Sequence, residues 1–262
     1  MPVVTSHGTN IYYEVHGEGE PTLVFAHGMG GNAAIWFQQV AEFSRSHRVI
    51  VFDHRYFARS ACPLDQFRPE WFADDALAIL DAEHIASAIF VCQSMGGWTG
   101  STLAVHHPDR VKGLVMSHTP GIFEHASAVN DRTKVAEMVS RPFSTFGSAA
   151  LAHDFPDKNR ALAVLYAQIS SFNGIDPAEI PRAIARADIG TDTDSLRDYE
   201  VPTLFITADH DILFQPGYIE ALSKTVPGAG FINLGDAGHS SYFELPAPFN
   251  AALQDFISSC SS

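Results

Sequence analysis

The sequence is poor in cysteine, with three in 262 residues and no CxxC pair. Such a sparse, odd set of thiols does not form a disulfide framework, so we expect free cysteines and a cytoplasmic location. No apolar run approaches the ~20 residues of a membrane-spanning helix. The N-terminal stretch MPVVTSHGTN also lacks the basic and apolar regions of a signal peptide. We therefore expect no membrane partner.

Positive charge is also scarce. The chain has 16 Lys and Arg against 30 Asp and Glu, a net charge of −14. A nucleic-acid binder normally presents a basic face, so we expect no nucleic-acid partner. The hydrophobic fraction of 46% and the charged fraction of 18% are typical of a folded globular protein. The length fits one large domain, or one domain that carries an insertion.

The thirteen histidines lack the spacing of a metal-binding motif. There is no HExxH, and His106 and His107 are adjacent, which points them apart on a helix. We therefore expect no metal and no cofactor.

Short apolar segments recur along the chain, with helix-like segments between them. They predict strands within TNIYYEVHGEGEP (9–21), PTLVFAHGMGG (21–31), HRVIVFDHR (47–55), SAIFVCQS (87–94), VKGLVMSHTP (111–120), VPTLFITADHD (201–211) and AGFINLGDAGH (229–239). Helices are expected over 33–44, 69–83, 95–107 and 246–258. This alternation predicts an α/β fold with a mostly parallel, doubly wound sheet that is covered on both faces.

Residues 122–198 interrupt this alternation. They contain several helix-like runs but no clear apolar strand, and prolines punctuate them. We therefore expect a core formed by 1–121 and 199–262, with a helical cap or lid formed by 122–198.

Polar residues follow the predicted strands at their carboxyl ends. The loop His27–Gly31 follows one strand, Ser94 follows another, Asp209 and Asp211 follow a third, and His239 follows the last. In open parallel sheets, ligands bind at this edge. We therefore expect a nucleophile, an acid and a base to meet there.

This chain resembles the α/β-hydrolase fold superfamily, serine-nucleophile esterase and lactonase type. The family's nucleophile elbow is G-x-S-x-G, which CQSMG at 92–96 approaches. Its oxyanion loop, its D-x-R-G-x-G-x-S turn, its acid strand and its histidine loop resemble HGMGG, DHRYFARS, VPTLFITADHD and GHSSYFELPAPFNAALQDFI. The resemblance covers nearly the whole chain.

The resemblance implies a catalytic triad of Ser94, Asp211 and His239. A serine hydroxyl needs a base to remove its proton, and an acid to orient that base. Asp209 is the alternative acid.

The backbone N–H groups of Met29 and Met95 would form the oxyanion hole. His27, Gly28, Trp98 and His118 are candidate substrate-binding residues. For His27, the alternative is that it braces its own loop. For His118 the alternative is a structural role, and for Trp98 it is packing in the core.

Five positions depart from the family pattern. Ala208 takes the place of the glycine in the G-x-x-D pattern that ends at Asp211. Cys92 replaces a glycine of the elbow, and we expect it to be a small buried side chain. Tyr56 and Ala58 replace glycines of DHRYFARS, so that turn should form only if neither position needs a positive φ. Pro216 lies five residues after Asp211, one more than is usual in the family.

The expected function is cleavage of a carboxylic ester or lactone of a small, largely apolar substrate through an acyl-enzyme. Carbon–carbon bond hydrolysis or an enol-lactonase reaction is the alternative that uses the same triad. Further alternatives are a ligand-binding or signalling protein that retains the hydrolase fold, and a cofactor-free oxygenase or lyase.

Overall fold

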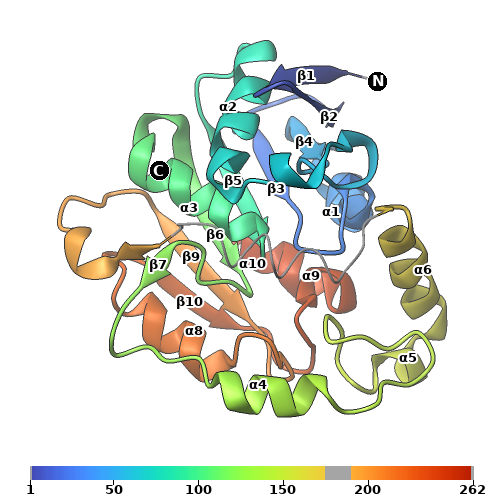
Figure 1. Cartoon of the computed structure of the whole chain (residues 1–262). Helices are drawn as coiled ribbons and strands as arrows, with labels where there is room; N and C mark the ends of the chain where they lie inside the picture. The colour runs from blue at the N-terminus through green and yellow to red at the C-terminus, as the bar shows by residue number, and fades with distance from the viewer. Residues whose placement is uncertain (1, 175–189, 261–262) are drawn as a thin grey trace.

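An eight-stranded, mostly parallel sheet forms the centre of the fold (Figure 1). The computed structural model describes residues 2–174 and 190–260. The strand order is β1-β2-β4-β3-β5-β6-β9-β10, and only the β1–β2 and β2–β4 pairs are antiparallel. The strands are β1 Val3–Ser6, β2 Thr9–His16, β3 Leu23–Ala26, β4 Val49–Phe52, β5 Ala88–Gln93, β6 Val111–Ser117, β9 Thr203–Thr207 and β10 Gly230–Asn233. The predicted α/β fold with a mostly parallel sheet is confirmed.

The edge strand β1 was not predicted. It pairs antiparallel with β2, with Val3 opposite Tyr12. Val3 is 55% exposed. An exposed edge strand of four residues has no need of a continuous apolar run, which is why the hydrophobic pattern did not indicate it.

Helices cover both faces of the sheet, and the sheet divides the hydrophobic core into two clusters. Successive residues of β3 alternate between the two halves: Leu23 and Phe25 belong to one cluster, Val24 and Ala26 to the other. Side chains of α2, α3 and α8 pack in the cluster with Val24, and those of α1 and α10 in the cluster with Leu23. The bounds of these helices, and of the short helix α9, are α1 Phe37–Phe43, α2 Phe72–Ala82, α3 Gly96–His106, α8 Pro216–Ser223, α9 Ser241–Glu244 and α10 Pro246–Cys260.

The predicted helices 33–44 and 69–83 each begin with a 3-10 turn before the α-helix starts. Short 3-10 turns lie at Ala33–Trp36, Ala58–Ser60, Leu64–Gln66, Pro69–Trp71, Pro108–Arg110 and Thr193–Ser195. None of the described helices has the length and hydropathy of a membrane span.

The segment between β6 and β9 is largely helical where it is described. It contains α4 Arg132–Val139, α5 Phe155–Lys158 and α6 Arg160–Ser171. Two short strands, β7 Phe123–Glu124 and β8 Thr191–Asp192, pair in parallel near its two ends. At two residues each, they are too short to produce an apolar run. Residues 175–189 of the predicted cap lie outside the described residues, and the division into core and cap stays a prediction.

Cys92 is the small buried side chain that we expected. It has no exposed surface and packs in the main core. A Cβ atom added at Gly100 of α3 would collide with its sulfur, so strand and helix are in close contact here. Burial raises the pKa of the Cys92 thiol well above its usual value, which leaves the sulfur protonated and unreactive.

The turn DHRYFARS forms with positive φ at both substituted positions. Tyr56 has φ 79° and Ala58 has φ 41°. The expectation that the turn requires no positive φ at these residues is therefore wrong. The ring of Tyr56 contacts those of Phe57 and Phe67, at centroid distances of 6.3 and 5.5 Å. This aromatic packing helps to hold Tyr56 in a conformation that favours glycine.

Replacement of Ala58 by glycine should stabilise the fold. A left-handed φ strains an alanine but not a glycine, so we expect A58G to raise the free energy of unfolding by about 0.5–1 kcal/mol. The matched control is A251G, at an exposed position within α10. There the same change should lower the free energy of unfolding, because glycine disfavours a helix interior. Urea denaturation measures both, and a destabilising A58G would contradict the strain assigned to this turn.

Candidate active site

Ser94 stands on a sharp turn between β5, which ends at Gln93, and α3, which begins at Gly96. Its φ is 50°, in the left-handed region. Its N–H donates to the carbonyl of Ser117 in β6 at 3.0 Å. The turn needs a glycine at 96, because a Cβ there would lie 2.7 Å from the carbonyl carbon of Ala26. Close packing of the helix N-terminus on β3 therefore places Ser94 at the carboxyl edge of the sheet.

Asp211 contacts His239. The Nδ1–H of His239 donates to Oδ2 of Asp211 at 2.9 Å. The other oxygen, Oδ1, accepts from the backbone N–H groups of Leu213 and Phe214 at 2.8 and 3.0 Å. Asp209 accepts instead from Nδ2 of Asn233 at an exposed position. The longer loop before Pro216 therefore still brings Asp211, not Asp209, to the histidine.

The Asp211 carboxylate is buried and charged. Burial alone would raise its pKa, but the electrostatic attraction of the His239 ring and the hydrogen bonds from His118 and His239 hold the pKa well below its usual value. A fixed negative charge at Nδ1 leaves the second nitrogen of His239, Nε2, with its lone pair. That atom is buried and has no hydrogen-bond partner among the described residues. Its lone pair is therefore available to accept a proton.

The loop His27–Gly31 lies beside Ser94. A Cβ added at Gly28 would come within 2.9 Å of the Cβ of Ser94. The Gly28 carbonyl accepts from Nδ1 of His27 at 2.8 Å and from the N–H of Gly31 at 3.0 Å. In a planar trans peptide the next N–H, that of Met29, points away from this carbonyl. Among the described residues, neither the Met29 N–H nor the Met95 N–H donates to another group.

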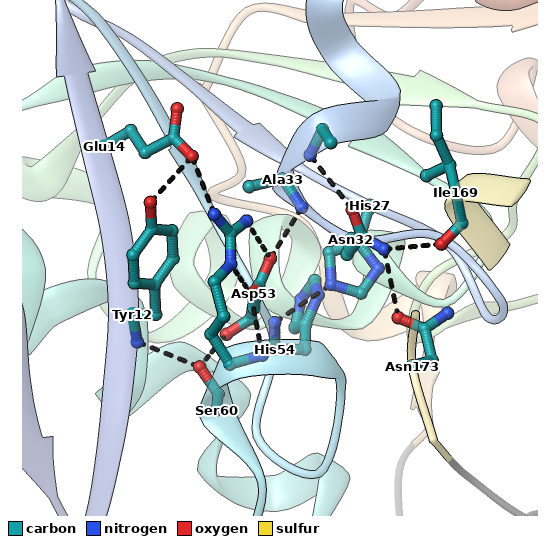
Figure 2. Close-up of polar contacts among 12 residues, drawn as sticks. Tyr12, Glu14, His27, Asn32, Ala33, Asp53, His54, Ser60, Ile169 and Asn173 are labelled. Carbon is teal, nitrogen blue, oxygen red and sulfur yellow. Dashed lines mark hydrogen bonds and ion pairs between the residues drawn. The ribbon is translucent and has the colours of Figure 1, made fainter. Parts of the chain in front are cut away.

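The ring of His27 braces its loop. Besides the bond to Gly28, its Nε2 accepts from the backbone N–H of His54 at 2.9 Å (Figure 2). The side chain has no exposed surface, and burial lowers its pKa to about 4. Both ring nitrogens are thus engaged by backbone groups, so the ring is not placed to contact a substrate. The alternative of a bracing role fits the structure.

His118 is likewise buried, with both ring nitrogens engaged. Nδ1 donates to Oδ2 of Asp211 at 2.8 Å, and Nε2 accepts from Oγ of Ser241 at 2.7 Å. The structure therefore does not support a substrate contact for His118, because its ring is hydrogen-bonded to Asp211 and Ser241. Trp98 is half-buried in an aromatic cluster that includes Met95.

The turn after β4 also holds the residues that follow the loop His27–Gly31 (Figure 2). The buried carboxylate of Asp53 accepts from the N–H of Ala33 at 2.7 Å and from the side chain of Arg59 at 2.8 Å. The segment between β6 and β9 contacts the same region, since Nδ2 of Asn32, directly after the loop, donates to the carbonyl of Ile169 in α6 at 2.9 Å. Asn173 donates to the carbonyl of Gly30 at 2.7 Å. The loop and the residues directly after it are thus held both by the turn after β4 and by the segment that contains α6.

Comparison with known proteins agrees with this geometry. The sequence model described as alpha/beta hydrolase fold matches residues 21–164. The chain belongs to the alpha/beta hydrolase fold family. The 3-oxoadipate enol-lactonase 2 of Acinetobacter baylyi is 27% identical over 261 residues, covering 96% of this chain and 94% of the relative.

Two solved structures support the same classification. Est816, described as an N-acyl homoserine lactone degrading enzyme, superposes with a TM-score of 0.79 at 26% identity, covering 97% of this chain and all of that one. The enol-lactonase from Burkholderia xenovorans superposes with a TM-score of 0.78 at 25% identity, covering 98% of this chain and all of that one. The predicted family is confirmed, and the predicted hydrolase of ester or lactone bonds agrees with all three relatives.

Two contacts of this alpha/beta hydrolase were not predicted. Nε2 of Gln93 donates to the carbonyl of His239 at 3.0 Å, which ties the histidine loop to the residue before Ser94. The carboxylate of Glu244 accepts from the N–H of Gly238 and from the N–H of Ala152, in the segment between β6 and β9, both at 3.0 Å. In the sequence, Gln93 and Glu244 are marked only by their places within the motifs CQSMG and GHSSYFE. Those places do not indicate the partners of either side chain.

One group of side chains in the described part of this alpha/beta hydrolase has the geometry to hold a metal ion. The ligand atoms of His118, Asp211 and His239 all lie within 4.8 Å of one another. Both histidines, however, place Nδ1 at hydrogen-bond distance from one carboxylate oxygen, 2.8 and 2.9 Å. We therefore interpret the group as a hydrogen-bond network.

The stability of the protein should carry a pH dependence from Glu244. Burial raises its pKa from 4.5 to about 7, against the lowering effect of the backbone hydrogen bonds. The folded state then binds a proton more tightly than the unfolded state, so this contribution to stability is full below pH 4.5 and is lost as pH rises through 7.

We therefore expect the free energy of unfolding of the wild type, relative to E244Q, to fall between pH 5 and 8 by up to ~1.4 kcal/mol per pH unit. Urea denaturation across this range measures the difference. The control E42Q, at an exposed position of α1, should show no such trend. A difference between wild type and E244Q that rises with pH would contradict the assignment.

Proposed function

We propose that the protein is a serine hydrolase that cleaves a carboxylic ester or lactone of a small, largely apolar compound. The observation that carries the proposal is Nε2 of His239, which is buried and has no partner among the residues that the structure describes, while Nδ1 is held by Asp211. A neutral imidazole in this tautomer is a general base. It shares the carboxyl edge of the sheet with Ser94 and the oxyanion loop.

In the proposed reaction, Oγ of Ser94 attacks the carbonyl carbon while Nε2 of His239 takes the hydroxyl proton. The negative oxygen that forms would accept hydrogen bonds from the N–H groups of Met29 and Met95, which have no acceptor in the described structure. His239 then gives the proton to the departing alcohol oxygen, which leaves an acyl group on Ser94. Water, deprotonated by His239, releases the acid and restores the serine.

An apolar substrate is supported by the side chains near Met95. Its side chain packs with the rings of Phe57, Phe67 and Phe72, and those of Tyr56 and Trp98 border the cluster. Among the phenylalanines of the insertion, Phe155 is buried against the core, whereas Phe172 is 73% exposed. The aromatic side chains next to Met95 therefore come mainly from the turn after β4 and the residues that follow it.

An enol-lactone is the second candidate substrate class. It is supported by two relatives named enol-lactonases. Opening of an enol-lactone uses the same attack of Ser94 on an acyl carbon. We further propose that 122–198 acts as a cap, since Asn173 donates to the carbonyl of Gly30 in the oxyanion loop and Asn32, directly after that loop, donates to α6. A cytoplasmic location is supported by the free cysteines Cys62, Cys92 and Cys260.

Replacement of Ser94 by alanine tests the proposal. Without the hydroxyl no acyl-enzyme can form, so turnover of p-nitrophenyl acetate and butyrate should fall by roughly 10⁴- to 10⁶-fold. The control S171A changes an exposed serine of α6 and should retain wild-type turnover. Wild-type protein that shows no multiple turnover of these esters or of small lactones would favour a ligand-binding role. Turnover that survives S94A intact would overturn the serine mechanism.

A further inference from the structure

His118 occupies a strained position at the end of β6. Its φ is 55° although it is not a glycine. Its N–H donates to the carbonyl of Ile206 in β9 at 2.8 Å, so its backbone is tied to the strand that leads to Asp211. The side chain is fully buried. A strained residue with a buried polar ring requires compensating contacts, and these are made with the carboxylate of Asp211.

The direction of these hydrogen bonds follows from the carboxylate. An ionised carboxylate only accepts, so Nδ1 of His118 carries the proton that it donates to Asp211. Burial lowers the pKa of His118, which keeps the ring neutral. Its Nε2 is then an acceptor, and the hydroxyl of Ser241 donates to it. Ser241 therefore fixes the tautomer that His118 presents to Asp211.

Two histidines thus share one oxygen. Oδ2 of Asp211 accepts from Nδ1 of His118 at 2.8 Å and from Nδ1 of His239 at 2.9 Å. Oδ1 is occupied by backbone N–H groups, so His118 completes the set of donors around the buried carboxylate. The two rings lie edge to face with centroids 5.5 Å apart. A charge divided between two donors binds each of them less strongly than it would bind one.

We propose that His118 is a positioning residue for the ester hydrolysis proposed above, on which this inference rests. Together with Ser241, it holds the Asp211 carboxylate toward His239 and limits the strength of the Asp211–His239 bond. The groups that face it are Asp211, from the loop after β9, His239, from the histidine loop, and Ser241, from α9. Because its ring is buried, it acts on the reaction only through Asp211.

The variants H118L and H118N test the proposal. Leucine removes the donor, whereas the side-chain amide of asparagine offers an N–H where Nδ1 stands, and asparagine tolerates a left-handed φ. We expect H118L to lower kcat by about 10- to 100-fold with KM little changed, since a hydrogen bond to a buried charge is lost. Asp211 would then bind His239 more strongly. The acid limb of the kcat/KM profile should therefore move to higher pH, by about half a unit.

H118N should restore most of kcat and the wild-type pH profile. S241A provides a second variant if H118L does not fold, and it should shift the acid limb in the same direction by a smaller amount. Circular dichroism and thermal melting establish that each variant is folded. A folded H118L or S241A with the wild-type kcat and pH profile, or an H118N that behaves as H118L, would overturn the inference.

Failure of this inference differs from failure of the proposed function. If the inference alone fails, wild-type ester turnover still depends on Ser94 and is insensitive to residue 118. If the proposed function fails, turnover is absent or does not depend on Ser94.

Discussion

A single buried carboxylate organises the site of this protein. Asp211 accepts four hydrogen bonds, two from its own loop and one each from His118 and His239. A charge so far from water would be costly if it were unpaired, and these four donors compensate for the lost hydration. The stable charge then decides the tautomer of His239, because Nδ1 must carry a proton and Nε2 must keep its lone pair. The base proposed for catalysis therefore follows from the solvation of Asp211.

Close backbone approach brings the remaining parts of the site together. A Cβ at Gly28 would collide with Gln93, and one at Gly96 would collide with β3. A Cβ at Gly238 would collide with the backbone of residues 151–152. These three glycines belong to the oxyanion loop, the elbow and the histidine loop. The loops can converge because these positions carry no side chain. Asn32, directly after the loop His27–Gly31, and Glu244, after the histidine loop, then contact the segment between β6 and β9 through Ile169 and Ala152.

The sequence predicted which segments meet but not how their side chains pair. Strands with both faces buried produce continuous apolar runs, so β5 and the position of Ser94 could be read from the chain. The partners of His118 could not, because its direction depends on a left-handed φ at the end of β6. The same applies to Tyr56, where aromatic packing holds a conformation that the residue type disfavours. These are contacts between distant segments, and no local pattern encodes them.

The most direct measurement is the rate at which a fluorophosphonate labels the protein, with the site located by peptide mass spectrometry. We expect one label per chain, on Ser94, at similar rates in wild type and D209N and at a rate roughly 10⁴-fold lower in D211N. A label on another residue, or D211N that reacts as fast as wild type, would contradict the role assigned to Asp211.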